Sequence, residues 1–350
     1  MRKLGLCLLI GLLLLSLTFT GCAKKTEDNK QQTEQPAQEK QEKYVIRLGI
    51  NQPIESPEYK GCEIFKKKLE EQSNGRFEVQ IFPSMQLGSM REQAEGVQIG
   101  SMEMTLQPVA VLTPFTPDVQ LMDLPWLFPT SDILLKVANS KVGDEILASM
   151  VEKNMVGLGF WNGGAKHFTT NNKEIHVPED FKGVKMRVMP SPLLIAQYKA
   201  WGANPIPIEY AELYNALQQG VVEGQENPLQ TIALNKFYEV QNTMILSGHG
   251  YMTYIMVANK TWFDKLPQDL QKLLRDINKE ASLEESKLVA ENEVKFLEQI
   301  KNSGIKVYEL NPEEKAKFRE ASLPVHEEFS KTEKQKALLQ KIYDAVDKLK

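Results

Sequence analysis

The chain has 350 residues, of which 42% are hydrophobic and 25% are charged, and its formal net charge is -4. These values are typical of a globular protein. The slight acidic excess argues against a surface that binds a polyanion, so we expect no nucleic-acid partner. Three Cys and four His residues show no zinc-type spacing, and the sequence predicts no metal and no cofactor.

Residues 1–21 predict a lipoprotein-type signal peptide. Two basic residues follow Met1, and residues 4–19 form an apolar run that is too short for a comfortable membrane span. Small residues precede Cys22, and the stretch FTGC resembles the lipobox of bacterial lipoproteins, with Phe19 where most lipoboxes have Leu. The resemblance implies acylation of Cys22. The alternative is ordinary signal cleavage beside an incidental cysteine.

Residues 22–43 predict the lipidated cysteine followed by a disordered tether. No large apolar side chain occurs between residues 23 and 43, and charges of both signs are mixed there, so this run has nothing to bury. Such a tether lets a folded domain stand away from a membrane to which the lipid alone attaches it. Cys62 is then the one thiol of the mature domain, and its helical context predicts a buried apolar role.

From Tyr44 onward, strand patterns alternate with helix patterns, which predicts an α/β fold with a mainly parallel sheet. The same rhythm returns in the second half of the chain, so we expect two α/β lobes with a ligand cleft between them. The expected strands are 44–51, 76–83, 102–112, 154–162, 167–171 and 183–190, and the expected helices are 56–75, 90–101, 191–202 and 211–220.

Residues 268–302 predict one long helix or two helices joined by a kink. Apolar side chains recur there on a charged background without Gly or Pro, and a continuous helix would be about 50 Å long. A helix that crosses both lobes explains this length. A coiled-coil dimerisation arm is the weaker reading, because the apolar spacing does not hold a strict heptad.

Three motifs carry a resemblance to a known family. They are K-x-R-V at residues 185–188, GANPIPI at 202–208 and ALQQGVVEGQENP at 216–228. Together they resemble the solute-binding proteins of TRAP (tripartite ATP-independent periplasmic) transporters, and the similarity extends from Tyr44 to about residue 304. It implies a two-lobed periplasmic-binding-protein-like fold with a long helix crossing both lobes. The predicted first lobe comprises 44–163 and about 252–285, and the second comprises 164–251 and about 286–350.

The resemblance also implies a function. Such a protein closes on a small organic acid, here a C4-dicarboxylate or a sugar acid, and delivers it to TRAP membrane permease subunits without transforming it. We therefore expect an extracytoplasmic protein, held at the cell membrane by its lipid, and not an enzyme. A ligand-sensing lipoprotein would share the same pocket. A secreted α/β hydrolase is disfavoured, because the sequence contains neither G-x-S-x-G nor H-E-x-x-H.

Four second-lobe residues match positions that hold the solute in the family. The resemblance assigns the carboxylate contact to Arg187, whose planar guanidinium suits a carboxylate. It assigns a second hydrogen bond to Asn227, which also suits a helix N-cap, and a packing contact to Tyr210, which could equally be a core aromatic. Lys166 stands where many members have Arg, so it offers a point charge instead of a fork.

Two first-lobe residues complete the predicted site. Asn51 follows the opening strand, where members of the family place a polar pocket residue. Gln107 lies near the end of the third strand, so strand geometry points it toward the cleft. Sialic-acid binders carry acidic residues where this chain has Met90 and Pro108, which lowers the expectation of sialic acid as the solute.

Overall fold

The computed structural model describes residues 42–350. The predicted signal peptide, Cys22 and the tether up to residue 41 lie outside the described residues. Within residues 42–350, no helix combines the length and the apolar character needed to cross a membrane. Cys62 is fully buried on the first helix, which confirms its predicted apolar role.

The first lobe contains strands in the order β2-β1-β3-β9-β4. β1 pairs in parallel with β2 and with β3, because the intervening helices carry the chain back before each new strand. β9 is antiparallel to β3 and β4, so the sheet is mixed and not mainly parallel as predicted. The strands are β1 (Tyr44–Ile50), β2 (Phe77–Phe82), β3 (Met104–Pro108), β4 (Met155–Thr170) and β9 (Tyr251–Asn259).

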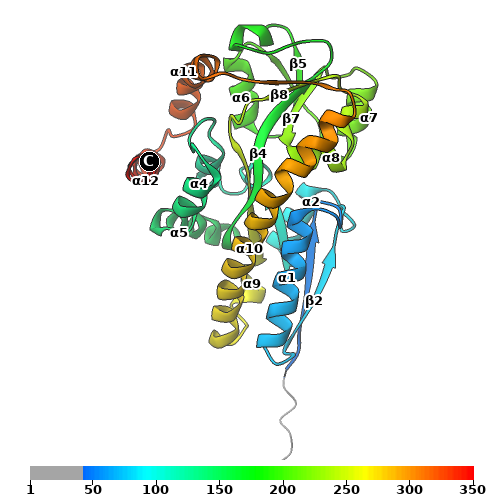
Figure 1. Ribbon diagram of the computed structural model, residues 1–350. Helices are drawn as coiled ribbons and strands as arrows, with labels where there is room; N and C mark the ends of the chain where they lie inside the picture. Colours follow the sequence, from blue (N-terminus) through cyan, green and yellow to red (C-terminus); the bar gives the residue numbers. More distant parts are fainter. Residues whose placement is uncertain (1–41) are drawn as a thin grey trace, which may run out of the picture. The chain divides into compact units, whose positions relative to one another are not determined.

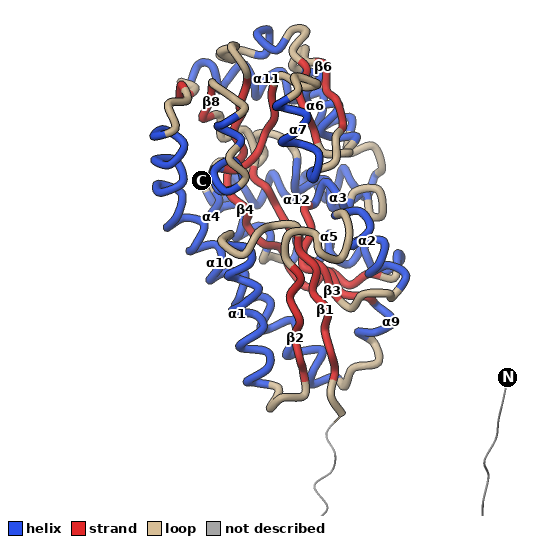
Figure 2. The backbone as a smooth tube through the Cα atoms, turned by 90° about the vertical axis from the view of Figure 1, so that its right-hand side faces the viewer, coloured by secondary structure: helices blue, strands red, loops and turns tan. Residues whose placement is uncertain are grey.

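The second lobe is built on the other end of β4. β7 is antiparallel to β4, β5 lies parallel between β7 and β6, and β8 pairs with β4 and β10. The strands are β5 (Lys185–Val188), β6 (Asn204–Pro207), β7 (Gly224–Pro228), β8 (Thr243–Leu246) and β10 (Lys306–Glu309). Figures 1 and 2 show both groups of strands and the long β4 that joins them.

A bulge interrupts β4 where it passes from one group of strands to the other. The pairing with β9 shifts register between Asn162 and Ala165. Gly164 has a φ of +94°, a conformation that glycine adopts without steric cost, and its N–H donates to Oδ1 of Asn162 at 3.1 Å. Bulges bend strands, so we expect β4 to bend at this point between its two groups of partners.

Helix starts follow the capping signals in the sequence. Oγ of Ser56 accepts from the N–H of Tyr59 at the start of α1, and Ser89 and Glu92 form a reciprocal capping box on α2. The helices are α1 (Pro57–Gln72), α2 (Met90–Ile99), α3 (Val109–Leu112), α4 (Ser131–Ala138), α5 (Lys141–Ala148), α6 (Pro192–Ala200), α7 (Leu213–Gln218), α8 (Leu229–Leu234), α9 (Lys260–Phe263), α10 (Gln268–Asn302), α11 (Pro312–Glu328) and α12 (Glu333–Leu349).

Short 3-10 helices connect several of these elements. They are η1 (Pro117–Asp123), η2 (Ser149–Lys153), η3 (Pro178–Phe181), η4 (Tyr210–Glu212) and η5 (Phe237–Glu239).

The predicted long helix is continuous. α10 has 35 residues, which at 1.5 Å per residue gives about 52 Å. It packs against α1 in the first lobe, along β4, and against α8 in the second lobe, so it crosses both as expected (Figure 1). Its buried side chains recur at three- and four-residue intervals, which is the pattern of one apolar stripe.

The last two helices pack on different parts of the chain. α11 packs against α6 in the second lobe, whereas α12 packs against α4 and α5, which the chain forms between the first lobe's strands β3 and β4 (Figure 1). The predicted division placed the whole segment after about residue 286 with the second lobe. The buried side chains of α12 belong to a core cluster that contains residues of both α4 and α6, so this cluster does not separate the two predicted lobes.

Candidate functional site

Arg187 has a buried guanidinium group that makes one hydrogen bond within the protein. It lies on β5 and is 2% exposed. Its Nε donates to the carbonyl oxygen of Ile208 at 2.9 Å, whereas Nη2 makes no hydrogen bond and no described carboxylate lies within ion-pair distance. Burial lowers the pKa of Arg187 to about 10. A buried cation without a paired acid is costly, so the arrangement favours an external anion.

Asn227 is held in one orientation by a relay of hydrogen bonds. Gln241 donates through Nε2 to a backbone carbonyl at 3.0 Å, so its Oε1 must accept, and it accepts from Thr169. Oγ1 of Thr169 then accepts from Gln225 at 2.8 Å, and Oε1 of Gln225 accepts from Nδ2 of Asn227. This relay fixes Nδ2 of Asn227 as a donor, with a second N–H proton left for another acceptor.

Strand pairing places Arg187 and Asn227 on the same face of the second-lobe sheet. Met186 pairs with Gly224, so alternation along the two parallel strands aligns Arg187 with Gln225 and Asn227. Glu226 points to the opposite face, where the hydroxyl of Tyr198 on α6 donates to it at 2.9 Å. The two faces of the sheet therefore differ: Arg187 lies on one face without an acid partner, and Glu226 lies on the other face with a hydrogen-bond donor.

Lys166 lies on the same face of the sheet as Glu226. Its ammonium lies 3.1 Å from Asp123 and 3.3 Å from Glu226, and all three side chains are nearly inaccessible to solvent. Burial alone would lower the pKa of Lys166, but the two carboxylates outweigh it and raise the pKa. Nε2 of His249 lies 2.6 Å from Glu226 and completes the cluster. The Lys166 ammonium thus has two partners within the chain.

Tyr210 reaches the same neighbourhood as Arg187. It starts η4, two residues after the carbonyl of Ile208 that Arg187 binds, and its hydroxyl makes no hydrogen bond. Burial raises the pKa of Tyr210, while the positive charge of Arg187 acts to lower it. The phenol therefore stays protonated at neutral pH and keeps a donor and an acceptor free.

Asn51 and its neighbour Gln52 bring first-lobe amides to the site. Nε2 of Gln52 donates to the hydroxyl of Tyr254 at 2.9 Å and to that of Thr231, on α8 of the second lobe, at 3.4 Å. Both amides are buried, and Oδ1 of Asn51 and Oε1 of Gln52 make no hydrogen bond. The sequence predicted Asn51. Gln52 and Tyr254 were missed, although the adjacency of Gln52 to Asn51 was a usable signal.

Glu58 is a further residue that the sequence did not single out. It lies in the first turn of α1, is 1% exposed, and accepts through Oε1 from Gln230 of α8 at 2.8 Å, while its Oε2 makes no hydrogen bond. Burial raises the pKa of Glu58 to about 7, and the Glu58 carboxyl acts to raise the pKa values of Tyr210 and Tyr254. Glu58 thus joins the first lobe to α8 and keeps one carboxylate oxygen unpaired.

Gln107 has a free acceptor of fixed orientation. Gln93 donates through Nε2 to the carbonyl of Gly88 at 2.8 Å, so Oε1 of Gln93 must accept. That oxygen accepts from Nε2 of Gln107 at 3.0 Å, which leaves Oε1 of the fully buried Gln107 unpaired. Its polar contacts lie with Gln93 and Thr105, within the first lobe.

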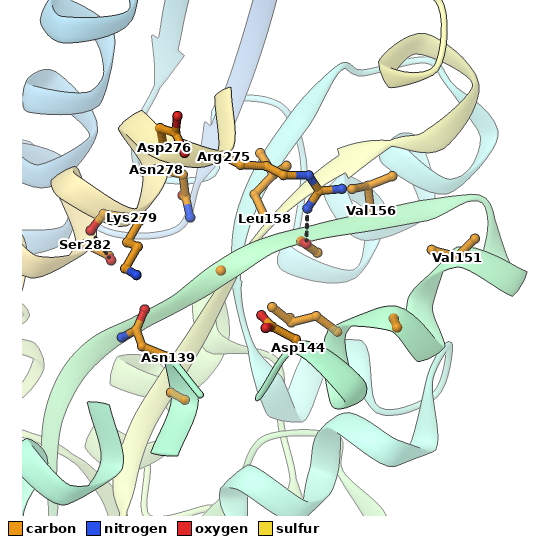
Figure 3. A pocket seen from close by; sticks show the side chains of 15 residues that line it. Asn139, Asp144, Val151, Val156, Leu158, Arg275, Asp276, Asn278, Lys279 and Ser282 are labelled. Carbon is orange, nitrogen blue, oxygen red and sulfur yellow. Dashed lines mark hydrogen bonds between the residues drawn. The ribbon is translucent and has the colours of Figure 1, made fainter. Parts of the chain in front are cut away.

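A separate pocket lies away from these residues. It has a volume of about 460 Å³ and opens between α5, β4 and α10 (Figure 3). Figure 3 shows Arg275 and Asp144 on its walls, and Nη1 of Arg275 lies 3.4 Å from the carbonyl of Gly157. None of the predicted binding residues lines it. The lining residues are Ala138, Asn139, Asp144, Leu147, Ala148, Val151, Val156, Gly157, Leu158, Gly159, Arg275, Asp276, Asn278, Lys279 and Ser282.

Comparison with known proteins gives consistent matches over nearly all of the described residues. Residues 48–332 match the family described as bacterial extracellular solute-binding protein, family 7. The chain is 33% identical to the C4-dicarboxylate-binding periplasmic protein DctP of Rhodobacter capsulatus over 291 residues, which cover 83% of this chain and 87% of the relative.

Two solved structures show the same fold. A TRAP periplasmic solute-binding protein from Desulfovibrio salexigens, with bound orotic acid, has a TM-score of 0.85 and 35% identity, and the match covers 88% of this chain and 100% of that one. One from Sulfurospirillum deleyianum, with bound succinate, has a TM-score of 0.79 and 35% identity, covering 86% and 98%.

Proposed function

The chain belongs to family 7 of the bacterial extracellular solute-binding proteins, and we propose that it captures a small organic acid through Arg187 and Asn227 and passes it to TRAP permease subunits. The family membership supports an extracytoplasmic transport role without a chemical step. The molecules bound in the two solved relatives, orotic acid and succinate, are both carboxylic acids.

One observation carries the proposal: the buried guanidinium of Arg187 has a free nitrogen and no acid partner within the described residues. A solute carboxylate would supply that missing charge. The free N–H of Asn227, on the same face of the sheet, would donate to the same anion. Tyr210 would close the side of the site with its unpaired hydroxyl.

Hydrogen bonds between the lobes support capture by closure. Gln52 on the first lobe contacts Thr231 on the second, and Glu58 on the first accepts from Gln230 on the second. These contacts form when the halves come together, so a solute that adds contacts to both halves raises the closed population. The β4 bulge at Gly164 is the proposed bending point.

Lys166 acts behind the sheet in this proposal. Its ion pairs with Asp123 and Glu226 leave it less free than Arg187 to hold a second anionic group. We assign it the role of holding β4 and β7 in register beside Asn227.

Attachment to the membrane is a separate part of the proposal. Cys22 follows an apolar signal-like run and small residues, so we propose that it carries a lipid and that residues 23–43 form the tether. Cells producing the Cys22→Ser variant should release the protein from the membrane fraction into the soluble extracytoplasmic fraction. Retention of the variant in the membrane fraction would refute the lipid attachment and leave the binding site untouched.

Isothermal titration with organic acids tests the binding role. Arg187→Ala should weaken binding of any acid that the wild type binds by at least about 100-fold, because a buried charged contact is lost. Arg275→Ala, in the separate pocket of Figure 3, is the matched control and should leave affinity within a few-fold. An Arg187→Ala protein that keeps wild-type affinity would overturn the assignment.

A further inference from the structure

Arg187 is the one buried cation of the described residues that has no carboxylate partner. The other buried cation, Lys166, already lies between two carboxylates. Exposed Lys and Arg side chains keep their hydration, so the absence of an ion-pair partner costs them little free energy. The site that we propose around Arg187 therefore has one unpaired positive charge, which can neutralise one carboxylate.

Unpaired acceptor oxygens of the first lobe lie against α8, the helix that directly follows Asn227. Asn227 is followed within one helical turn by Gln230 and Thr231, and these two residues hold Glu58 and Gln52 of the first lobe. Each of these two first-lobe residues keeps a buried acceptor atom without a hydrogen bond, Oε2 of Glu58 and Oε1 of Gln52, as do Asn51 and Gln107 in the same lobe. The carboxylate contact and the free acceptors thus converge on one short stretch of β7 and α8.

The orientation of the Glu58 contact is fixed by a backbone group. Nε2 of Gln230 donates both to Oε1 of Glu58 and to the carbonyl oxygen of Gly163, each at 2.8 Å. A carbonyl cannot donate, so the atom of Gln230 that faces Glu58 must be its nitrogen. One oxygen of Glu58 thereby accepts a hydrogen bond within the protein, and the other makes none.

We propose that the solute is a hydroxylated monocarboxylate whose hydroxyl groups donate to Glu58 and Gln52, and that this wall rejects dicarboxylates. The inference rests on the proposed function, because it assumes that one carboxylate is held by Arg187. Hydroxyl donors satisfy buried acceptors, whereas a second carboxylate would bring acceptor against acceptor and negative charge against Glu58. Glu58 is then the residue that determines specificity.

The ionisation of Glu58 sets the conditions of the test. Its pKa is raised by burial to about 7, so at pH 8 the ionised form predominates. The titratable neighbours are Cys62 on the same helix, Tyr210, Tyr254, and Glu285 on α10, and burial raises the pKa of each. Arg187 stays charged at pH 8. A protonated Glu58 could donate to a carboxylate, and measurement at pH 8 removes that complication.

Three four-carbon acids separate the contributions: D-erythronate, butyrate and succinate, each titrated calorimetrically into the full folded domain at pH 8. We expect D-erythronate to bind most tightly, because its hydroxyl groups can donate hydrogen bonds to the charged Glu58. We expect succinate to bind at least about 100-fold more weakly than D-erythronate, because its second carboxylate lacks these donors and is repelled by Glu58. Glu58→Gln should lower the ratio of the two affinities by about tenfold or more. Glu55→Gln, an exposed acid three residues earlier, is the matched control and should leave the ratio unchanged.

The outcomes distinguish this inference from the proposed function. If succinate binds as tightly as D-erythronate and Arg187→Ala abolishes both, the carboxylate site stands and the inference is wrong. An affinity ratio that does not change in Glu58→Gln also overturns it. If none of the three acids binds, the inference fails while the proposed function stands. If binding does not depend on Arg187, both the function and the inference fail.

Discussion

Replacing Arg187 by methionine should make the ligand-free protein more stable while it abolishes solute binding. Burial lowers the pKa of Arg187 from 12.5 to about 10, and the side chain is 2% exposed. The folded state therefore holds this proton less firmly than the unfolded chain does. The resulting penalty, about 3 kcal/mol, is present in full at every pH below about 10.

Methionine removes the charge and keeps an unbranched side chain of similar reach. The substitution also loses the hydrogen bond from Nε to the carbonyl of Ile208, which is worth about 1 kcal/mol. The net expectation is a free energy of unfolding about 2 kcal/mol higher than that of the wild type, together with binding weakened by at least about 100-fold.

Urea unfolding of the ligand-free protein at pH 7 gives the first quantity, and isothermal titration gives the second. Arg91→Met is the control, because the Arg91 side chain is 61% exposed and its replacement should change stability by less than about 0.5 kcal/mol. A ligand-free Arg187→Met protein that is less stable than the wild type would refute the reasoning, because the guanidinium would then have a favourable partner inside the fold.

Three further predictions concern the residues around this site. Lys166→Met should lower the free energy of unfolding by about 3–5 kcal/mol, because its two buried carboxylate partners lose their counter-charge, and a loss below 1 kcal/mol in thermal or urea unfolding would contradict this. Because burial raises the pKa of Glu58 to about 7, the folded state binds this proton more firmly than the unfolded chain does. The free energy of unfolding of the wild type should therefore fall by about 3 kcal/mol relative to that of Glu58→Gln as pH rises from 4.5 to 7. Parallel profiles of unfolding free energy against pH for the two proteins would argue against this. Gly61→Ala should destabilise by about 1–3 kcal/mol, because its Cβ would lie 2.5 Å from the Trp161 ring where α1 meets α10, and an unchanged melting temperature would show that the helices separate freely.

Locally encoded elements were predictable from the sequence. The helix starts at Ser56 and Ser89 carry side chains that cap the backbone, and α10 shows its period over ten turns without Gly or Pro. These signals act between residues close in the chain, so their outcome depends little on the rest of the fold.

Elements that depend on distant partners were not predictable in the same way. The antiparallel pairing of β9 between β3 and β4 joins segments about 100 and 150 residues apart in sequence, and no local pattern states which strands will be neighbours. Likewise, the apolar face of α12 is visible in the sequence, but nothing near it names α4 and α5 as its partners.

The residues of the candidate site also divide into those that local sequence motifs predict and those whose role depends on distant partners. Arg187 and Asn227 lie in motifs that the sequence displays, whereas Glu58 lies in an ordinary amphipathic helix, and its burial results from α8 of the other lobe. The Lys166 partners, Asp123 and Glu226, come from two distant segments, and only the folded chain reveals that they absorb its charge. Pairing across the fold decides which polar groups remain free.

The position of α12 has a consequence for biogenesis. Its side chains cover surfaces of α4 and α5, which were synthesised almost 200 residues earlier. During synthesis or export, those surfaces stay exposed until the final helix emerges. Premature termination or loss of the C-terminal helix therefore leaves exposed apolar surface on an otherwise folded lobe. Truncation at the carboxyl terminus is therefore expected to expose core surface, because Leu338, Leu339, Ile342 and Val346 of α12 are buried.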